Sequence, residues 1–521
     1  MDRESLLKQL ENESKVWDFV VIGGGATGLG IAVDAASRGF SVALVEQSDF
    51  SKSTSSKSTK LVHGGVRYLA QGDVRLVLEA LRERGIMRRN AAHLVRDQRF
   101  IIPCYRWWEG AFYTVGLTVY DLMAGRLSFG PSRFKRRNTV LSAIPTLRSK
   151  GLRGGVLYHD GQFDDSRMAV NLAQTASERG AVVLNYMKVT SLIKGEDHKV
   201  QGVRATDAET GRHYDIRGHV VVNATGVFVD EILKMDDPAV AHLVRPSQGV
   251  HVVLDRSFLG GDSAIMIPKT DDGRVLFAVP WHNEVVVGTT DTLRDHPELE
   301  PRALESEIGF ILDTAGRYLS KPPRRSDVLA VFAGLRPLAA PKDGEESTKE
   351  ISRSHKILVA DSNLITITGG KWTTYRRMAE DTIDRAIRLG LAQKRACVTR
   401  TLKIHGCKAN PDFNDYLYVY GTDRAAVERL IDRDPLMEER LHPDYDFRVG
   451  QVVWAVRNEM ARTVEDVLSR RVRLTFLDAR AAVEAAPRVA AVMARELGRD
   501  DAWAEAEVEA FGKVAEHYIL R

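Results

Sequence analysis

The stretch DFVVIGGGATGLGIAVDAASRGFSVALVE, residues 18–46, decides the fold of the N-terminal region. Its first five residues are mostly apolar and β-branched, which is typical of a strand buried on both faces. A glycine-rich turn follows, and then a helical pattern that stops at Gly39. Residues 41–45 form a second apolar run, which ends in Glu46. The sequence therefore predicts a strand, a tight turn, a helix and a second strand, in that order.

The glycine-rich turn matches the pattern G-x-G-x-x-G. The first glycine makes the tight turn, the second lets the backbone approach a pyrophosphate, and the third lets the helix pack closely on the strand. Phosphates are stabilised at a helix N-terminus, and Glu46 can accept hydrogen bonds from a ribose. We therefore predict that this region binds an adenine dinucleotide. The predicted contacts in the turn are Gly23, Gly25, Ala26, Thr27 and Gly28.

Length and composition limit the class of protein. A chain of 521 residues is too long for one core, so two or three domains are expected. A formal charge of +4 is small for this length, which argues against a nucleic-acid binder. The sequence shows no metal-ligand spacing, and its scattered cysteines favour a reducing compartment. They are Cys104, Cys397 and Cys407. The charged N-terminus and the lack of a long apolar run favour a cytoplasmic location, with attachment to a membrane face left open.

A hydroxyl-rich stretch, SKSTSSKSTK at 51–60, comes directly after the second predicted strand. Composition alone would make it a flexible polar loop. It is followed by LVHGGVRYL at 61–69, which brings an imidazole, two glycines, a guanidinium and a phenol together. A Gly-Gly pair lets the backbone approach a planar ligand, while His and Arg are natural partners for an alcohol and a phosphate.

These motifs resemble one known family. TSSKSTKLVHGGVRYL and the opening GGGATG are similar to the FAD-dependent (aerobic, quinone-linked) glycerol-3-phosphate dehydrogenases. The resemblance covers most of the chain, because further similar segments follow in the family's order. They are VVNATG (221–226), SQGVHVV (247–253), VPWHNEVVVGTTD (279–291), AGLRPL (333–338) and TITGGKWTTYRRMAE (366–380).

The resemblance and the patterns together predict an α/β protein with three parts. A discontinuous Rossmann-like FAD-binding domain is expected over 1–80, 160–240 and 350–390. An antiparallel substrate or cap domain is expected over 81–159 and 241–349, and a helical domain over 391–521. Beyond the turn and Glu46, the expected cofactor contacts are Thr54, Ser55, Ser56, Lys60, Leu61, His63, Gly64, Gly65, Thr225, Gly226, Gly370, Lys371, Trp372 and Thr373.

Several segments have local predictions. Residues 157–190 are expected to form a turn, a helix capped by Asp164-Asp165-Ser166, and a strand. Residues 199–207 belong to a small meander, and 219–223 to a buried strand that ends in Ala-Thr-Gly. Alternating strands over 245–345 predict an antiparallel sheet. The predicted strands in it are 250–253, 264–267, 275–279 and 285–288.

Near the end of the FAD-binding part, 357–367 is expected to be one strand, followed by a Gly-Gly turn and a helix to Ala386. The N-terminus of that helix would favour negative charge on a flavin. Beyond residue 395 a helical face is predicted, formed by Val453, Val456, Met460, Val464 and Val467. Thr463 and Asp466 are expected to form a capping box. The run 470–473 is basic, and the C-terminal helical domain as a whole is expected to serve packing, dimer contact or membrane contact.

Two arginine-rich stretches precede the predicted sheet. Residues 74–100 look helical, and their arginines are expected on a solvated face. Residues 103–138 mix aromatic side chains with a basic cluster. They suit a segment lying at a bilayer surface, or a core helix with a basic end. The family's peripheral membrane habit favours the bilayer.

The resemblance implies oxidation of sn-glycerol 3-phosphate to dihydroxyacetone phosphate, with electrons passed to a membrane quinone. His251 is the first choice for the base that takes the hydroxyl proton, and His63 is the alternative. Cationic and phenolic side chains would hold the phosphate and orient the substrate. The candidates are Arg67, Tyr68, Arg336 and Lys371. Attachment to the inner face of the cell membrane and a homodimer are further expectations.

Other functions remain as alternatives. A soluble glycerol-3-phosphate oxidase would pass electrons to oxygen and release peroxide. An amino-acid oxidase of the same fold would not need HGG-x-RY with Arg336 and Lys371, which suit a phosphate. A nicotinamide-dependent enzyme has no use for the HGG and TGGK motifs. A flavin-containing nucleic-acid binder would need a more basic face.

Overall fold

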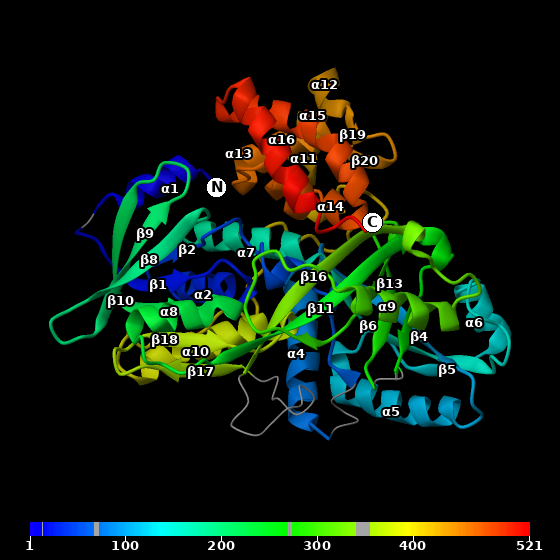
Figure 1. The fold of residues 1–521 in the computed structure, drawn as a ribbon. Coiled ribbons are helices and arrows are strands. Elements are labelled where there is room, and N and C mark those ends of the chain that lie inside the picture. Colours follow the sequence, from blue (N-terminus) through cyan, green and yellow to red (C-terminus); the bar gives the residue numbers. More distant parts are fainter. Residues whose placement is uncertain (13, 67–71, 269, 271–272, 340–354, 521) are drawn as a thin grey trace.

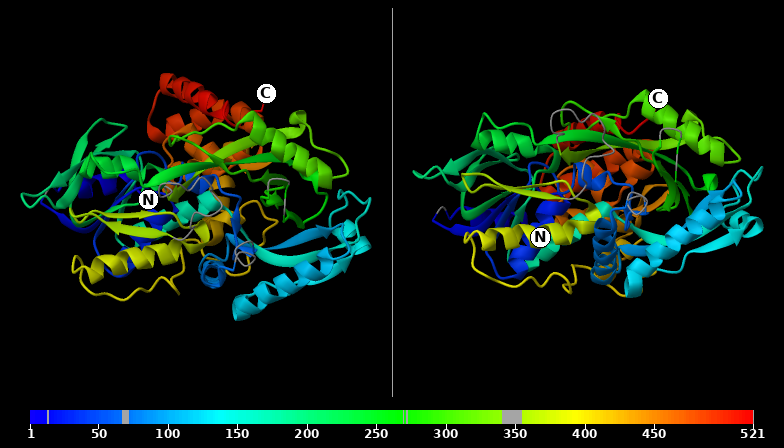
Figure 2. Two further views of the ribbon diagram at one scale, coloured as in Figure 1. Left: turned by 60° about the horizontal axis from the view of Figure 1, so that its bottom comes forward. Right: turned by 90° about the horizontal axis from the view of Figure 1, so that it is seen from below.

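The computed structural model of the protein describes residues 1–12, 14–66, 72–268, 270, 273–339 and 355–520. Its strands form two large sheets that lie side by side, and helices of the C-terminal region cover one side of both (Figure 1). Figure 2 shows the same layers from below. This arrangement of mixed sheets and helices confirms the predicted α/β class.

The first sheet is the Rossmann-like one, and its central strands are parallel. They lie in the order β18 (Ile365–Thr368), β10 (His213–Asn223), β1 (Val16–Ile22), β2 (Val42–Val45) and β7 (Val182–Leu184). Helix α2 (Ala26–Ser37) connects β1 to β2, so the predicted strand, turn, helix and strand are confirmed. Segments far apart in the sequence share this sheet. The proposed domain boundaries stay predictions.

Antiparallel strands extend this sheet at its edge. Strands β8 (Met187–Lys194) and β9 (Val200–Asp207) form the predicted meander with β10. The expected single strand over 357–367 is wrong. Residues 356–368 instead form a hairpin of β17 (Lys356–Val359) and β18, because the chain turns at Asn363, whose φ is 67°.

The second sheet is mostly antiparallel, as predicted for 245–345. Its main path is β15 (Thr292–Leu293), β11 (Val244–Asp255), β14 (Glu284–Gly288), β13 (Leu276–Trp281), β12 (Ala264–Ile267), β4 (Val95–Cys104), β6 (Gly154–Phe163) and β3 (Leu61–Val62). Strand β16 (Val328–Ala339) pairs with β11, and β5 (Arg133–Arg136) pairs with β6. Long strands β11 and β16 carry the candidate substrate residues.

Two local predictions in this region need correction. The helix expected over 74–100 is α4 (Val74–Asn90), and residues 95–104 form β4 instead. Its arginines do not all lie on a solvated face, because Arg84 is buried and pairs with Asp160 at 2.7 Å. The turn expected at residue 157 lies inside β6, whereas the following helix α7 (Asp165–Glu178) is confirmed with Asp164 as its N-cap.

The remaining helices cover the sheets and form the C-terminal layer. Those outside this layer are α1 (Arg3–Leu10), α5 (Glu109–Ala124), α6 (Arg137–Ala143), α8 (Val229–Asp236), α9 (Glu305–Tyr318) and α10 (Tyr375–Arg388). Those in the layer are α11 (Arg424–Ile431), α12 (Pro435–Glu438), α13 (Val449–Glu459), α14 (Leu474–Leu477), α15 (Ala479–Leu497) and α16 (Asp501–Ala515), with a short β19 (Arg440–His442) and β20 (Tyr445–Arg448) hairpin. The layer has its own apolar core.

The predicted apolar face over 453–467 does not belong to one helix. Helix α13 ends at Glu459, because Met460 adopts a left-handed conformation with φ of 57°. The capping box is confirmed: the backbone N–H of Thr463 donates to the Asp466 carboxylate, and the Asp466 N–H donates to the Thr463 hydroxyl. The helix therefore restarts on the far side of a break.

The basic run 470–473 lies inside the molecule. We call Arg470, Arg471 and Arg473 the interior arginine cluster, and each side chain is at most 2% exposed. Both Arg470 and Arg471 bind Asp49, which follows β2, and Arg473 binds Asp165 at the start of α7. The run thus fastens the C-terminal layer to the Rossmann-like sheet. These are packing contacts within the chain.

Among the described residues, no helix is long and apolar enough to span a bilayer. In the same residues, no group of histidine, cysteine and acidic side chains is placed to hold a metal ion.

Candidate active site

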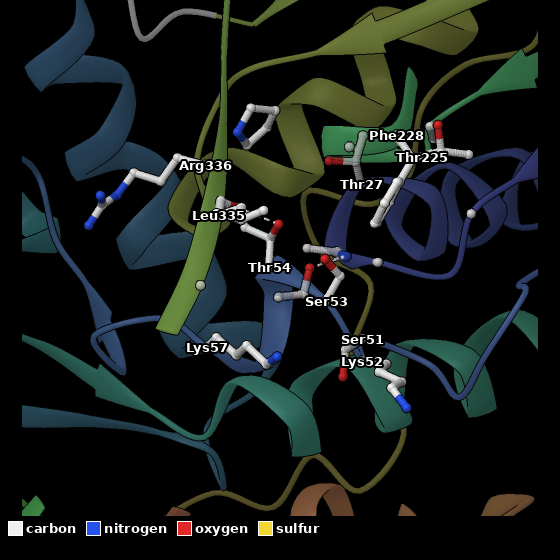
Figure 3. A pocket seen from close by; sticks show the side chains of 18 of the residues that line it. Thr27, Ser51, Lys52, Ser53, Thr54, Lys57, Thr225, Phe228, Leu335 and Arg336 are labelled. Atoms are coloured by element: carbon white, nitrogen blue, oxygen red, sulfur yellow. Dashed lines mark hydrogen bonds between the residues drawn. The ribbon is translucent and has the colours of Figure 1, made fainter. Parts of the chain in front are cut away.

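A long cavity runs between the carboxyl ends of the parallel strands and the second sheet. It is lined by the glycine turn after β1, by the loop 51–61, by the turns after β10 and β18, and by β11 and β16. Figure 3 shows part of it, with Thr54 next to Leu335 in the middle, Thr27 and Thr225 to one side and Arg336 to the other. The site is therefore assembled from segments spread over most of the chain.

The glycine turn packs too closely to admit side chains. Gly23 has a φ of 108°, and a Cβ there would lie 2.8 Å from the carbonyl oxygen of Ala224. A Cβ on Gly28 would lie 1.9 Å from the carbonyl oxygen of Gly23. Gly28 therefore serves helix packing and lies outside the cavity lining, whereas Gly23, Gly25, Ala26 and Thr27 line the cavity.

Glu46 lies at the end of β2 and lines the cavity, as its predicted ribose role requires. Its carboxylate accepts hydrogen bonds from the backbone N–H of Gly24 at 2.6 Å and of Ser48 at 2.9 Å. Burial raises its pKa, and these two backbone hydrogen bonds oppose that rise. The acid is thus fixed beside the glycine turn by the backbone.

The hydroxyl-rich loop is an ordered wall of the cavity. Thr54 donates to the carbonyl of Leu335 on β16 at 2.6 Å, which ties the loop to the second sheet. The Ser55 hydroxyl accepts from the N–H of Ala26 at 3.0 Å, and its carbonyl accepts from the indole of Trp372 at 2.8 Å. Leu61 also lines the cavity, whereas Ser56 is buried behind it.

Lys60 is a predicted cofactor contact that the structure places elsewhere. Its side chain is 0% exposed, lies outside the cavity lining, and donates to Asp165 at 2.7 Å and to the Ser56 carbonyl at 2.6 Å. Burial lowers its pKa to about 7, although the nearby carboxylate of Asp165 opposes this. Its ammonium group therefore anchors the loop from behind.

The His-Gly-Gly segment is split between the cavity and the layer beneath it. His63 lines the cavity, and its backbone N–H donates to the Thr373 hydroxyl at 3.3 Å. Gly64 and Gly65 are outside the lining, and the Gly64 N–H donates to the hydroxyl of Tyr120 on α5 at 2.8 Å. Two of the predicted substrate residues, Arg67 and Tyr68, lie outside the described residues.

The two later turns supply the other predicted contacts, and all of them line the cavity. They are Thr225, Gly226, Gly370, Lys371, Trp372 and Thr373. The two glycines have φ values of 64° and 77°, which other residues rarely adopt. The strand, turn and helix pattern of the N-terminus is thus repeated at β18 and α10, and both turns face one cavity.

The substrate candidates of the second sheet lie on neighbouring strands. His251 on β11 is 1% exposed, and its Nε2 lies 2.9 Å from the Thr59 hydroxyl. Arg336 on β16 donates to the Thr289 hydroxyl at 3.0 Å and to the Thr290 carbonyl at 3.1 Å. Burial lowers the pKa of His251 well below its ordinary value, and the charge of Arg336 adds to this. The imidazole is therefore neutral, as a proton acceptor must be.

Sequence reasoning missed several residues of this site. Thr59 and Lys57 line the cavity, and Thr289 orients Arg336. Thr59 lies inside the hydroxyl-rich stretch, but its neighbour on β11 is 192 residues away, so spacing gave no signal. Thr289 lies at the end of the motif 279–291, but its contact with Arg336 depends on strand pairing and not on spacing.

The cavity fits FAD. A side chain cannot replace the glycine at the tight turn, and Glu46 is held beside it where a ribose would bind. At the other end, Nδ1 of His251 is buried without a hydrogen-bond partner among the described residues, as expected of a group awaiting a ligand. The nucleotide end and the reactive end thus belong to one cavity.

Comparison with known proteins agrees with this geometry. Residues 18–376 match the family model described as FAD dependent oxidoreductase, and residues 364–504 match the C-terminal domain of alpha-glycerophosphate oxidase. The mitochondrial glycerol-3-phosphate dehydrogenase of Bos taurus is 40% identical over 97% of this chain and 74% of its own length. That of Schizosaccharomyces pombe is 38% identical over 96% of this chain and 87% of its own length.

Solved structures give the same result. The glycerol-3-phosphate dehydrogenase of Bacillus halodurans, complexed with FAD, has a TM-score of 0.80 and 29% identity, and covers 99% of this chain and 97% of its own. A glycerophosphate oxidase of Mycoplasma pneumoniae shares the fold, with a TM-score of 0.57 and 16% identity over 74% of this chain and 98% of its own. The chain therefore belongs to the FAD-dependent glycerol-3-phosphate dehydrogenase family, and its cofactor is FAD.

Proposed function

We propose that the protein oxidises sn-glycerol 3-phosphate to dihydroxyacetone phosphate. One observation carries this proposal. The cavity that fits FAD is lined both by the neutral, buried imidazole of His251 and by the guanidinium of Arg336, which Thr289 holds in place. An alcohol needs a proton acceptor, and a phosphate needs a cation. The substrate named for the relatives of 38–40% identity carries both groups.

Each residue has one task in this reaction. When bound, FAD supplies the isoalloxazine that accepts a hydride from carbon 2 of the alcohol. His251 takes the proton of the carbon 2 hydroxyl. Arg336, held by the hydroxyl of Thr289, binds the phosphate together with Lys371. Arg67 and Tyr68 remain proposed substrate contacts, and His63 remains the alternative base.

Rapid mixing under anaerobic conditions tests this assignment. Flavin absorbance is followed after adding sn-glycerol 3-phosphate to the protein and to its His251→Gln and His63→Gln variants. Loss of a general base slows such a step by about 10²- to 10⁴-fold, so His251→Gln is expected to lose that much. If His251→Gln reacts at the normal rate and His63→Gln does not, His63 is the base.

The electron acceptor is proposed to be a quinone in the inner face of the cell membrane. Support comes from α5, which has two apolar faces. Its inner face, with Leu117 and Tyr120, is buried, and its outer face carries a stripe at helical spacing. The outer face consists of Phe112, Val115, Val119 and Leu122, which are 44–75% exposed. A stripe of this kind suits the interface of a bilayer.

Basic side chains surround the outer face of α5. Exposed arginines lie at both ends of the helix and along β5, and the aromatic ring of Trp107 beside them is 81% exposed. The arginines are Arg106, Arg126, Arg133, Arg136 and Arg137. Cations beside aromatic and apolar groups match an anionic lipid surface. Figure 1 places α5 on the side of the molecule opposite the C-terminal helices.

Vesicle flotation tests the membrane proposal. The protein is expected to float with vesicles that contain anionic lipid, and a Phe112→Ser/Leu122→Ser variant is expected to remain in the dense fraction. A matched control is Leu358→Ser, an exposed apolar residue on β17. The alternative is that the protein without vesicles is a dimer and that Phe112→Ser/Leu122→Ser has half its mass. That result would contradict the proposed bilayer contact and support a second copy of the chain as the partner of this face.

A soluble oxidase is the second candidate function. It is favoured by one finding, the match of 364–504 to a domain named for an oxidase. Peroxide equimolar with product in air would support the oxidase, and turnover that requires a quinone would support the dehydrogenase.

A further inference from the structure

We propose that Thr59 is a positioning residue for His251: its hydroxyl accepts the hydrogen bond of Nε2–H, which holds the imidazole in place and leaves the Nδ1 lone pair to take the substrate proton. This inference rests on the proposed role of His251 as the base. It starts from the 2.9 Å contact between the Thr59 hydroxyl and Nε2 of His251.

The imidazole of His251 has no room to turn. On one side it stacks on Phe332 of β16, with ring centres 4.8 Å apart and planes at 16°. On the other side it faces Gly288 of β14, where an added Cβ would lie 2.3 Å from Cδ2 of the ring. Residues 288 and 332 are the strand partners of His251 in the sheet. The two ring nitrogens therefore keep fixed and different surroundings.

Thr59 is the hydrogen-bond partner that the described residues offer to this ring. Nδ1 is buried and has no partner among them, whereas Nε2 has the Thr59 hydroxyl. For Nδ1 to take a proton, the ring hydrogen of neutral His251 must lie on Nε2, where it is donated to the Thr59 hydroxyl. Thr59 can accept this bond before and after the transfer, which an aliphatic residue of the same shape cannot do.

The charges around His251 make this partner important. Arg336 and Lys60 both lower the pKa of the imidazole, in addition to the effect of burial. Behind Lys60, the carboxylate of Asp165 binds both Lys60 at 2.7 Å and Arg473 at 3.0 Å, so one acid faces two cations. When the substrate O–H bond breaks and the proton binds Nδ1, a further cation forms near Arg336 and Lys60. Its Nε2 hydrogen then needs an acceptor, because an unpaired buried charged donor is costly.

The backbone around Thr59 is held on both sides. Ser58 donates to Asp165 at 2.6 Å through its hydroxyl, and Lys60 donates to the same carboxylate at 2.7 Å. Thr59 itself lines the cavity. The loop thus holds the Thr59 hydroxyl at Nε2 of His251 and allows it little movement.

The test is the limiting rate of flavin reduction by sn-glycerol 3-phosphate in Thr59→Val, which keeps the shape and loses the hydroxyl. Loss of a hydrogen bond to a charged group predicts a rate about 10- to 100-fold lower. The substrate concentration at half-saturation should change by less than about threefold, because binding precedes the proton transfer. Thr59→Ser should restore the rate, and FAD content and the unfolding midpoint serve as controls. Thr59→Ala replaces Thr59→Val if the latter does not load FAD.

A double-mutant cycle with His251→Gln separates this inference from the function beneath it. If Thr59 acts through His251, Thr59→Val should cause no further loss in the His251→Gln background. An equal loss in both backgrounds, or an unchanged rate in Thr59→Val alone, would overturn the inference while His251 remains the base. A normal rate in His251→Gln alone would instead overturn the proposed base.

Discussion

Two arginine-rich segments of this protein have similar composition and opposite surroundings. The interior arginine cluster at 470–473 is at most 2% exposed and is bound by Asp49 after β2, by Asp165 of α7 and by acids just before it in the sequence. The segment at 133–137 lies on β5 and the start of α6, and most of its side chains are exposed. Asp49, Asp165 and Glu465 surround the first, whereas the outer face of α5 lies beside the second.

The difference shows that a basic run in the sequence can lie either inside the molecule or on its surface. A buried arginine is tolerated only when its hydrogen bonds are met by acids and carbonyls. The interior cluster meets this condition because β2, α7 and the C-terminal layer bring their acids to it. Among the described neighbours of the segment at 133–137, no acids and carbonyls enclose its charged side chains. These charges therefore stay accessible to water or to lipid. The first holds the molecule together, and the second is proposed to hold it at a membrane.

Removing an acid from the interior cluster is expected to have the largest effect. Asp49 binds Arg470 at 2.6 Å and Arg471 at 2.7 Å, and all three side chains are buried. Asp49→Ala should lower the free energy of unfolding by about 3–5 kcal/mol, because it leaves uncompensated buried charge. Chemical denaturation measures this. The matched control is Glu509→Ala, which breaks an exposed ion pair with Lys513 and should leave the free energy of unfolding nearly unchanged. Equal losses in both variants would contradict the assignment.

Acid should weaken the same cluster. Burial alone would raise the pKa of Glu465, but Arg470 and Lys52 lower it to about 2, from an ordinary value of 4.5. An acid with a lowered pKa stabilises the fold above its ordinary pKa, and the stabilisation is lost as the pH falls toward the lowered value. The unfolding free energy should therefore fall between about pH 4.5 and pH 2, and less steeply in Glu465→Gln. A slope that is the same in both proteins would contradict this.

A smaller effect is expected where α5 contacts the site. The Tyr120 hydroxyl accepts from the Gly64 N–H at 2.8 Å and donates to Asp160 at 2.9 Å, inside the molecule. Tyr120→Phe leaves the Gly64 N–H and the Asp160 carboxylate without this partner, and it should lower the free energy of unfolding by about 1–3 kcal/mol. FAD affinity and the denaturation midpoint measure the effect. Because α5 also carries the proposed membrane face, a variant with normal stability but weaker FAD binding would show that this helix supports the His-Gly-Gly segment.

The smallest effect on stability is expected on the outer side. Arg136 and Arg137 are exposed, so Arg136→Ser/Arg137→Ser should change the free energy of unfolding by less than about 0.5 kcal/mol. Binding to anionic vesicles should weaken by about 2 kcal/mol, or roughly 30-fold, because each cation near the surface contributes about 1 kcal/mol. Unchanged vesicle binding would remove this segment from the membrane proposal.

Local patterns allowed much of the fold to be predicted from the sequence. The β1–α2–β2 unit, the cap of α7 and the antiparallel strands after residue 245 follow from apolar spacing, glycines and capping residues. The β17–β18 hairpin was missed although Asp361, Ser362 and Asn363 form a polar turn signal between its two apolar strands. In the site, predicted residues such as Gly23, Thr54 and Thr225 line the cavity, whereas Gly28, Gly64, Gly65, Ser56 and Lys60 lie outside its lining.

The rest depends on contacts between distant parts of the chain. Arg471 and Asp49 are 422 residues apart, and their burial follows from the packing of a whole helical layer. Thr59 and His251 meet because one follows β2 and the other lies on β11 of the neighbouring sheet. No spacing rule connects such pairs. Their roles follow from the placement of both sheets around one cavity.

The most direct test of the account is a two-step anaerobic measurement. One equivalent of sn-glycerol 3-phosphate is added to the FAD-loaded protein, which is then mixed with either oxygen or anionic vesicles containing a quinone. The account predicts loss of flavin absorbance at one equivalent and a faster return with the vesicles than with oxygen. A flavin that stays oxidised with this substrate but responds to dithionite would contradict the substrate. A return that is fastest with oxygen, with release of peroxide, would contradict the membrane quinone.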